Sequence, residues 1–142
     1  MHKKFYVSGF LYHLDSQQIL LQQDTNSKDL PIQWYLFEGS YTEKNTAEMV
    51  FKNILSDLLD IKVDTVNTVY SYENESKNQA IVYAEIDKLQ DFEPKNGIIF
   101  NWFSFKNIHK LQVAKQTKHD IVVGQRVIEA SGRKSRGEHT FQ

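Results

Sequence analysis

One amphipathic stretch in the first half of the chain constrains the fold more than any other part of the sequence. Its apolar residues recur at steps of three and four, which lines one face of a helix: Val50, Phe51, Ile54, Leu55 and Leu58. Asn45 precedes the pattern and Glu48 follows three positions later, a pair able to satisfy the first free N–H groups of a helix. The sequence therefore predicts a helix over residues 46–59, entered from a loop over residues 37–44.

Six other segments are rich in aromatic and β-branched residues and are bounded by turn residues, which is typical of strands. These are residues 4–14, 18–23, 33–36, 62–72, 79–86 and 98–105. A short helix or turn over residues 106–111 and a second helix over residues 119–130 follow, with Gly132 as the predicted stop. This order of elements predicts an α+β fold or an α/β/α sandwich around a mixed sheet.

The composition is that of an ordinary soluble globular chain. Of its 142 residues, 40% are apolar and 25% are charged, and the length suits one domain. The net charge of −1 gives no electrostatic reason to expect binding to nucleic acid or to a membrane. The chain has no cysteine, which excludes disulfides, thiolate metal sites and a cysteine nucleophile. Since no apolar run approaches a membrane span, we expect a cytoplasmic protein.

The end of the chain differs from the rest. Residues 132–142 are polar and contain Arg133, Lys134 and Arg136, so we expect one domain over residues 1–131 and a flexible tail. A small arm that attracts phosphate is the alternative interpretation of this tail.

The helical stretch and the loop before it resemble the Nudix box of the Nudix hydrolases. In that box a glycine, five residues, a glutamate and seven residues precede Arg-Glu-apolar-any-Glu-Glu-any-Gly-apolar. Gly39, Leu55 and Ile61 fit its opening glycine and its central and closing apolar positions without a gap. Trp34 and Leu36 stand where the family often has Trp and Leu before a Pro-Gly-Gly turn. The resemblance implies the Nudix sandwich.

The positions that carry the family's chemistry depart from its pattern. They are Phe37-Glu38 for Pro-Gly, Asn45 for the first glutamate, Asn53-Ile54 for Arg-Glu, Asp57-Leu58 for Glu-Glu and Asp60 for the late glycine. The family uses the helix glutamates to hold magnesium beside a pyrophosphate, because Mg²⁺ prefers oxygen ligands. Only Asp57 is a carboxylate among the three clustered helix positions, and a lone aspartate on a helix is more often solvated than metal-bound. We therefore expect the helix to serve packing.

Two functional hypotheses follow from this resemblance. The favoured one is a Nudix-fold domain, impaired or inactive as a pyrophosphohydrolase, that binds a nucleotide-like small molecule or a protein. The alternative is a divergent magnesium-dependent hydrolase of a nucleoside diphosphate derivative, with Asp57 as metal ligand and catalytic residue. Carboxylates from elsewhere would then complete its site: Glu43, Glu48 or Glu85. An accidental resemblance in an unrelated α+β domain is a third, less favoured interpretation.

The candidate substrate-binding residues are Trp34, Phe37 and Gly39, which lie in or just before the loop that cradles substrate in the family. No cofactor is expected unless the chain is active, in which case it is Mg²⁺. A homodimer is compatible with the sequence. His119 and Asp120 are adjacent, and adjacent helical residues do not face one another, so they are not expected to form an acid–base pair.

Overall fold

The computed structural model describes residues 3–28, 32–73 and 75–135 of the chain. Its elements are β1 (Lys4–His13), β2 (Gln18–Asp24), β3 (Phe37–Tyr41), α1 (Ala47–Leu59), β4 (Asn67–Glu73), β5 (Lys77–Ile86), β6 (Ile98–Ser104), the 3₁₀ helix η1 (Phe105–Lys110) and α2 (Lys115–Ser135). This is the expected α+β fold. No helix among the described residues is both long enough and apolar enough to span a membrane.

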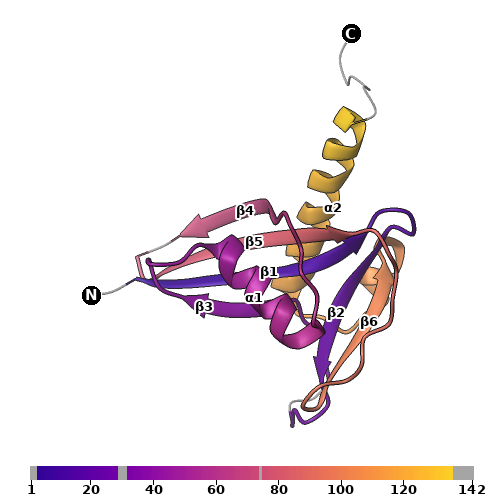
Figure 1. Cartoon of the computed structure of the whole chain (residues 1–142), viewed down its shortest axis with the longest axis horizontal. Coiled ribbons are helices and arrows are strands. Elements are labelled where there is room, and N and C mark those ends of the chain that lie inside the picture. The colour runs from indigo at the N-terminus through magenta and orange to yellow at the C-terminus, as the bar shows by residue number, and fades with distance from the viewer. Residues whose placement is uncertain (1–2, 29–31, 74, 136–142) are drawn as a thin grey trace.

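The six strands form one mixed sheet organised around β1. The strand order is β4-β5-β1-β2-β6, and β3 also pairs with β1. Strand β1 runs parallel to β5 and antiparallel to both β2 and β3. Because β3 pairs with the first half of β1 and β2 with its end, the antiparallel β2–β6 pair diverges from the remaining strands (Figure 1). The Gln22 side chain joins the two parts by donating a 3.0 Å hydrogen bond to the carbonyl of Leu36.

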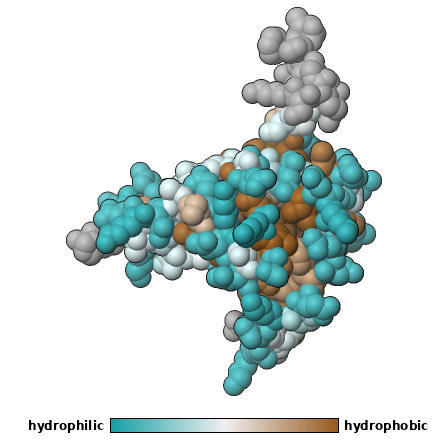
Figure 2. Space-filling view, viewed as in Figure 1, coloured by the Kyte–Doolittle hydropathy of each residue, from teal (hydrophilic) through white to brown (hydrophobic). Residues whose placement is uncertain are grey.

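Alternation along the strands produces a core on each face of the sheet. Helix α1 covers one face, where Phe51 and Leu55 pack with Val7 and Phe37. Helix α2 packs on the other face, whose core includes Phe10, Tyr83 and Ile121. Figure 2 views the α1 side and shows apolar side chains gathered beside α1, toward the β2–β6 strand pair.

The predicted helix at residues 46–59 is confirmed, but its predicted cap is wrong. Thr46 is the N-cap, and its hydroxyl accepts a 3.2 Å hydrogen bond from the backbone N–H of Met49. The hydroxyl therefore satisfies a helix N–H that the Asn45–Glu48 pair was expected to serve.

Other boundaries also differ from the sequence predictions, among them the start of β4 at Asn67 in place of residue 62. The predicted loop contains strand β3, because residues 37–41 pair with β1 despite their weak strand pattern. Residues 34 and 35, predicted as strand, make only isolated bridges. Helix α2 runs through the predicted stop at Gly132 to Ser135, and the rest of the predicted tail lies outside the described residues.

Candidate functional site

The face of α1 that corresponds to the glutamates of the Nudix box is packed into the protein. Ile54 and Leu58 both contact the core on this side of the sheet. A Cβ atom built on Gly39 would lie 2.7 Å from Cδ1 of Ile54, so the glycine lets β3 approach the helix closely. The opening glycine of the box frame is thus explained here by packing.

The C-terminal end of α1 carries Asp57, the one carboxylate among the three helix positions where the box has glutamates. Asp57 is exposed, and its backbone carbonyl accepts a hydrogen bond from the ammonium of Lys95. Asp60, at the box position of the late glycine, has φ +56° and caps the helix in the left-handed conformation that this position requires.

The described residues do not provide the donor set that magnesium prefers. They contain no group of three or more His, Cys, Asp or Glu side chains placed to hold a metal ion. Glu48 lies in the first turn of α1, about 13 Å along the helix from Asp57. Glu43 precedes the helix, and Glu85 lies on β5. The carboxylates proposed for a rebuilt site are therefore not gathered around Asp57.

The three candidate substrate-binding residues do not line a common hollow. Phe37 is fully buried, and its ring stacks on Phe100 with the ring centroids 6.0 Å apart. Trp34 packs edge-on against Phe103, at a centroid distance of 4.9 Å. Gly39 alone borders an open hollow beside β3.

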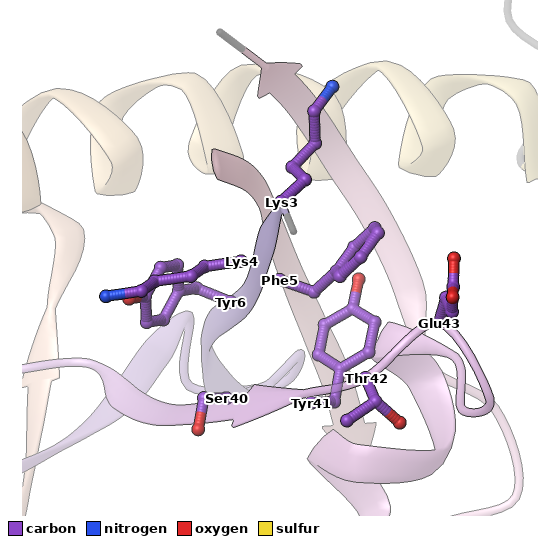
Figure 3. A pocket seen from close by; sticks show the side chains of 8 residues that line it. All are labelled: Lys3, Lys4, Phe5, Tyr6, Ser40, Tyr41, Thr42 and Glu43. Atoms are coloured by element: carbon purple, nitrogen blue, oxygen red, sulfur yellow. The ribbon is translucent and has the colours of Figure 1, made fainter. Parts of the chain in front are cut away.

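Two adjoining hollows of about 570 and 350 Å³ lie along β1 and β3. Both are bordered by Tyr6 and Ser40, and the larger one also reaches Phe5, Tyr41 and Glu43 on the other side of the sheet (Figure 3). We call the part on the α2 side the β1–β3 hollow and define it by its residues: Lys4, Tyr6, Ser8, Glu38, Ser40 and Gln79. In Figure 3, Lys4 and Tyr6 project together on one side of β1, whereas Phe5 and Tyr41 lie on the other.

The strand register arranges the hollow in three rows across the sheet, since directly paired residues share a face. Lys4 pairs with Lys77 in the first row. Tyr6 occupies the second row, between Gln79 on β5 and Ser40 on β3. In the third row, Ser8 pairs with Glu38. The hollow therefore has Lys4 at one end, with Lys77 beside it on β5, a tyrosine in the middle and a carboxyl group at the other end.

Neighbouring contacts fix the floor of the hollow. Gln79 is only 8% exposed, and its amide donates a 3.0 Å hydrogen bond to the Ser8 hydroxyl. The Lys77 ammonium lies 6.0 Å from the ring centroids of both Tyr6 and Tyr72, which is the outer range of a cation–π contact. These contacts hold the lysine and the two rings together on the sheet surface.

At the far end of the hollow, no lysine or arginine among the described residues lines it beside Glu38. Partial desolvation raises the pKa of its carboxyl group, although much of the side chain reaches solvent. A second hollow, at the junction of β2 and β3, also borders Glu38 and includes Gln22 and Tyr35. The carboxyl group thus faces two hollows whose described linings contain no lysine or arginine beside it.

The charge of Glu38 is predicted to lower stability near neutral pH. A folded-state pKa above the ordinary value of 4.5 means that stability is lost as pH rises through the raised pKa. Glu38→Gln is therefore expected to raise the Tm at pH 7 but to leave it nearly unchanged at pH 4. Thermal unfolding followed by circular dichroism measures the Tm of both proteins at both pH values. An equal rise in Tm at pH 4 and pH 7 would contradict the prediction.

Beyond the hollow, α2 is joined to the sheet by a polar network. The Tyr70 hydroxyl donates a hydrogen bond to the buried Asp120 carboxylate, which also accepts one of 2.9 Å from Gln116. Desolvation and then Asp120 raise the pKa of Tyr70 above its ordinary value of 10.0. His119 instead meets the Tyr70 ring edge-on. Asp120 therefore serves to dock the helix.

The sequence matches no protein-family model and no curated relative. Solved structures do resemble the fold. One, from a study of MutT of Aliivibrio salmonicida and Vibrio cholerae, is 15% identical with a TM-score of 0.71, and the similarity covers 89% of this chain and 98% of that one. The NUDIX domain of Shewanella oneidensis NrtR, complexed with ADP ribose, is 13% identical with a TM-score of 0.69 and 90% of each chain covered.

A NUDIX-family hydrolase from Clostridium perfringens is 13% identical, with a TM-score of 0.64 and with 88% of this chain and 96% of that chain covered. These likenesses agree with the mixed sheet between α1 and α2 and with the gapless frame of the box. The chain therefore has the Nudix fold.

Proposed function

We propose that this Nudix-fold domain acts by binding a ligand and does not hydrolyse nucleoside diphosphate derivatives. The observation that carries the proposal is that Ile54 and Leu58, both partly buried, pack against the core at two positions where the family's box has glutamates. With Asp57 alone, the box helix lacks the several carboxylates that neutralise magnesium beside a pyrophosphate. The spacing of the box is present but two of its glutamate positions hold apolar residues that pack, which supports binding over catalysis.

The ligand that we favour is nucleotide-like, and a protein partner is the second possibility within the binding function. The NrtR domain with ADP ribose is an example of a Nudix fold holding such a ligand. In this chain the β1–β3 hollow is our candidate site, because it offers a tyrosine ring, a buried amide and lysines. Gly39 borders it, whereas Phe37 and Trp34 pack in the cores on the two faces of the sheet. The proposed setting is the cytoplasm.

The alternative is a weak magnesium-dependent hydrolase centred on Asp57. One observation favours it: a hollow of about 440 Å³ between the end of α1 and the loop that follows β5 is bordered by Asp57, Asp91 and Glu93. Lys95 borders the same hollow, which makes it less favourable for a divalent cation.

A calorimetric titration with Mg²⁺ and Mn²⁺, followed by an assay of ADP-ribose hydrolysis, separates the two functions. We expect no heat of metal binding and no metal-dependent release of AMP. Turnover that requires metal and disappears in Asp57→Ala would overturn the binding proposal. Asp64→Ala, which removes the same charge from an exposed residue after α1, is the control for a nonspecific charge effect.

A further inference from the structure

We infer that the β1–β3 hollow is a self-complementary surface on which a second copy of the chain docks, with Lys4 of each copy against Glu38 of the other. The inference goes beyond the proposed function by naming a protein partner, and it implies that this partner and a small ligand compete for one surface. It follows from the charged, aromatic and polar side chains on the α2-side face of β1, β3 and β5.

This part of the sheet is left open by both helices. Helix α1 covers the opposite face, and α2 meets the sheet further along, where Gly124 lies against the Phe10 ring of β1. No described residue of α2 lines the hollow, and Lys4, Glu38 and Ser40 are exposed. The face is therefore accessible to a partner as large as a protein.

The two charged side chains of the hollow have no partner within their own chain. Among the described residues, neither the Lys4 ammonium nor the Glu38 carboxylate takes part in an ion pair or a side-chain hydrogen bond. Other charges at the Lys4 end are engaged, since Lys3 and Glu73 form a 3.0 Å ion pair and Lys77 lies against two tyrosine rings. The strand register also places Glu73 in a row that faces α1. One positive and one negative charge are thus available to a partner.

The strand register makes this surface its own complement. Lys4 and Glu38 lie two rows apart, about 13 Å along the strands, on either side of the row that contains Tyr6 and Ser40. A two-fold axis along that middle row places the lysine of each copy over the carboxylate of the other. Two contacts between opposite charges then form at once, and neither charge meets its own copy.

The middle row supplies the uncharged part of the contact. Tyr6 projects beside Lys4 from β1 (Figure 3), and it pairs with Ser40 on β3 and with Gln79 on β5. On the two-fold axis the half-buried Tyr6 ring meets the same ring of the second copy, a contact that adds apolar area while the hydroxyl stays hydrogen-bonded. The floor is already fixed, because the Gln79 amide donates a 3.0 Å hydrogen bond to Ser8. Because the face is small and polar, we expect the dimer to be reversible.

A second copy also accounts for the carboxyl group at the end of the hollow. Desolvation raises the pKa of Glu38, and no opposite charge among the described residues offsets it. The partner's Lys4 would supply that charge. At the dilution used for circular dichroism we expect a monomer, so the Tm prediction for Glu38→Gln is unaffected.

Sedimentation velocity of charge-reversal variants tests the inference. We expect the wild-type full chain to form a dimer whose fraction rises with protein concentration. Lys4→Glu and Glu38→Lys should each raise the dissociation constant about tenfold or more, because each places two pairs of like charges in contact. An equimolar mixture of the two variants should dimerise again, since every charged contact between them joins opposite charges.

Two control variants make the same charge changes outside the hollow. Lys62→Glu and Glu93→Lys alter exposed residues, and neither should change the dissociation constant of the dimer. Unfolding curves of all four variants show whether each is folded. If a reversal unfolds the chain, Lys4→Gln and Glu38→Gln replace it, with a smaller expected weakening of the dimer.

The contrary results are distinct for this inference and for the proposed function. A wild-type chain that stays monomeric up to its solubility limit would overturn the inference. A dimer that persists in both Lys4→Glu and Glu38→Lys, or a mixture of these variants that stays monomeric, would also overturn it. Each of these results leaves the proposed function standing, whereas metal-dependent hydrolysis of ADP-ribose would overturn that function and leave the pairing of the two copies unaffected.

Discussion

Phe51→Ala is expected to reduce the free energy of unfolding by about 3–5 kcal/mol, the usual cost of truncating a buried aromatic side chain. Phe51 is fully buried on α1, between Val7 and Leu55 in the core of this face of the sheet. Its ring also reaches the backbone of β1, since a Cβ built on Gly9 would lie 2.7 Å from Cε1 of Phe51. The substitution would leave a cavity that the strand backbone cannot fill. Urea unfolding monitored by circular dichroism measures the loss.

Met49→Ala is the matched control for Phe51→Ala, because it lies on the same helix and is 52% exposed. Its expected cost is within about 1 kcal/mol. Similar losses for both variants would contradict the packing of α1 against β1 and with it the two-face arrangement of the core.

Gly9→Ala is expected to cost about 3 kcal/mol or more, at the upper end of the usual range for overpacking. A Cβ at this position would lie 2.4 Å from the carbonyl oxygen of Val82 and 2.8 Å from its Cγ2 atom. Because β1 and β5 pair in parallel here, the backbone oxygen can move only if the two central strands separate. The same urea unfolding experiment measures this effect.

Ser40→Ala serves as the control for Gly9→Ala. Ser40 is exposed on β3, and replacing its hydroxyl group should change stability by about 0.5 kcal/mol or less. A Gly9→Ala protein as stable as the wild type would show that β1 and β5 do not approach each other as closely as their register requires.

The sequence was most informative where the apolar pattern alone decides the structure. The stripe that includes Phe51 and Leu55 predicted α1 and its buried face, because three- and four-residue spacing is a local property. The apolar, β-branched and aromatic run within residues 79–86 similarly predicted most of β5. The absence of carboxylates at positions 54 and 58 was also visible in the sequence, since the box frame has no gap.

Features that depend on distant pairing could not be predicted in the same way. Strand β3 consists of five residues with Glu38 and Gly39 among them, and only its pairing with β1 makes it a strand. The β1–β3 hollow was missed for the same reason. One signal was present: Lys4, Tyr6 and Ser8 alternate along β1 as polar or amphipathic residues before the apolar second half begins. Their partners on β3 and β5 come from the register, which is not local.

Nuclear magnetic resonance with Mn²⁺ shows whether the box helix α1 holds a metal. Substoichiometric Mn²⁺ is added to the ¹⁵N-labelled full chain, and the broadening of each amide resonance is recorded. We expect no focus of broadening at the C-terminal end of α1. Strong broadening centred on residues 54–58 and abolished by Asp57→Ala would contradict it and would show that the Nudix metal site has been rebuilt.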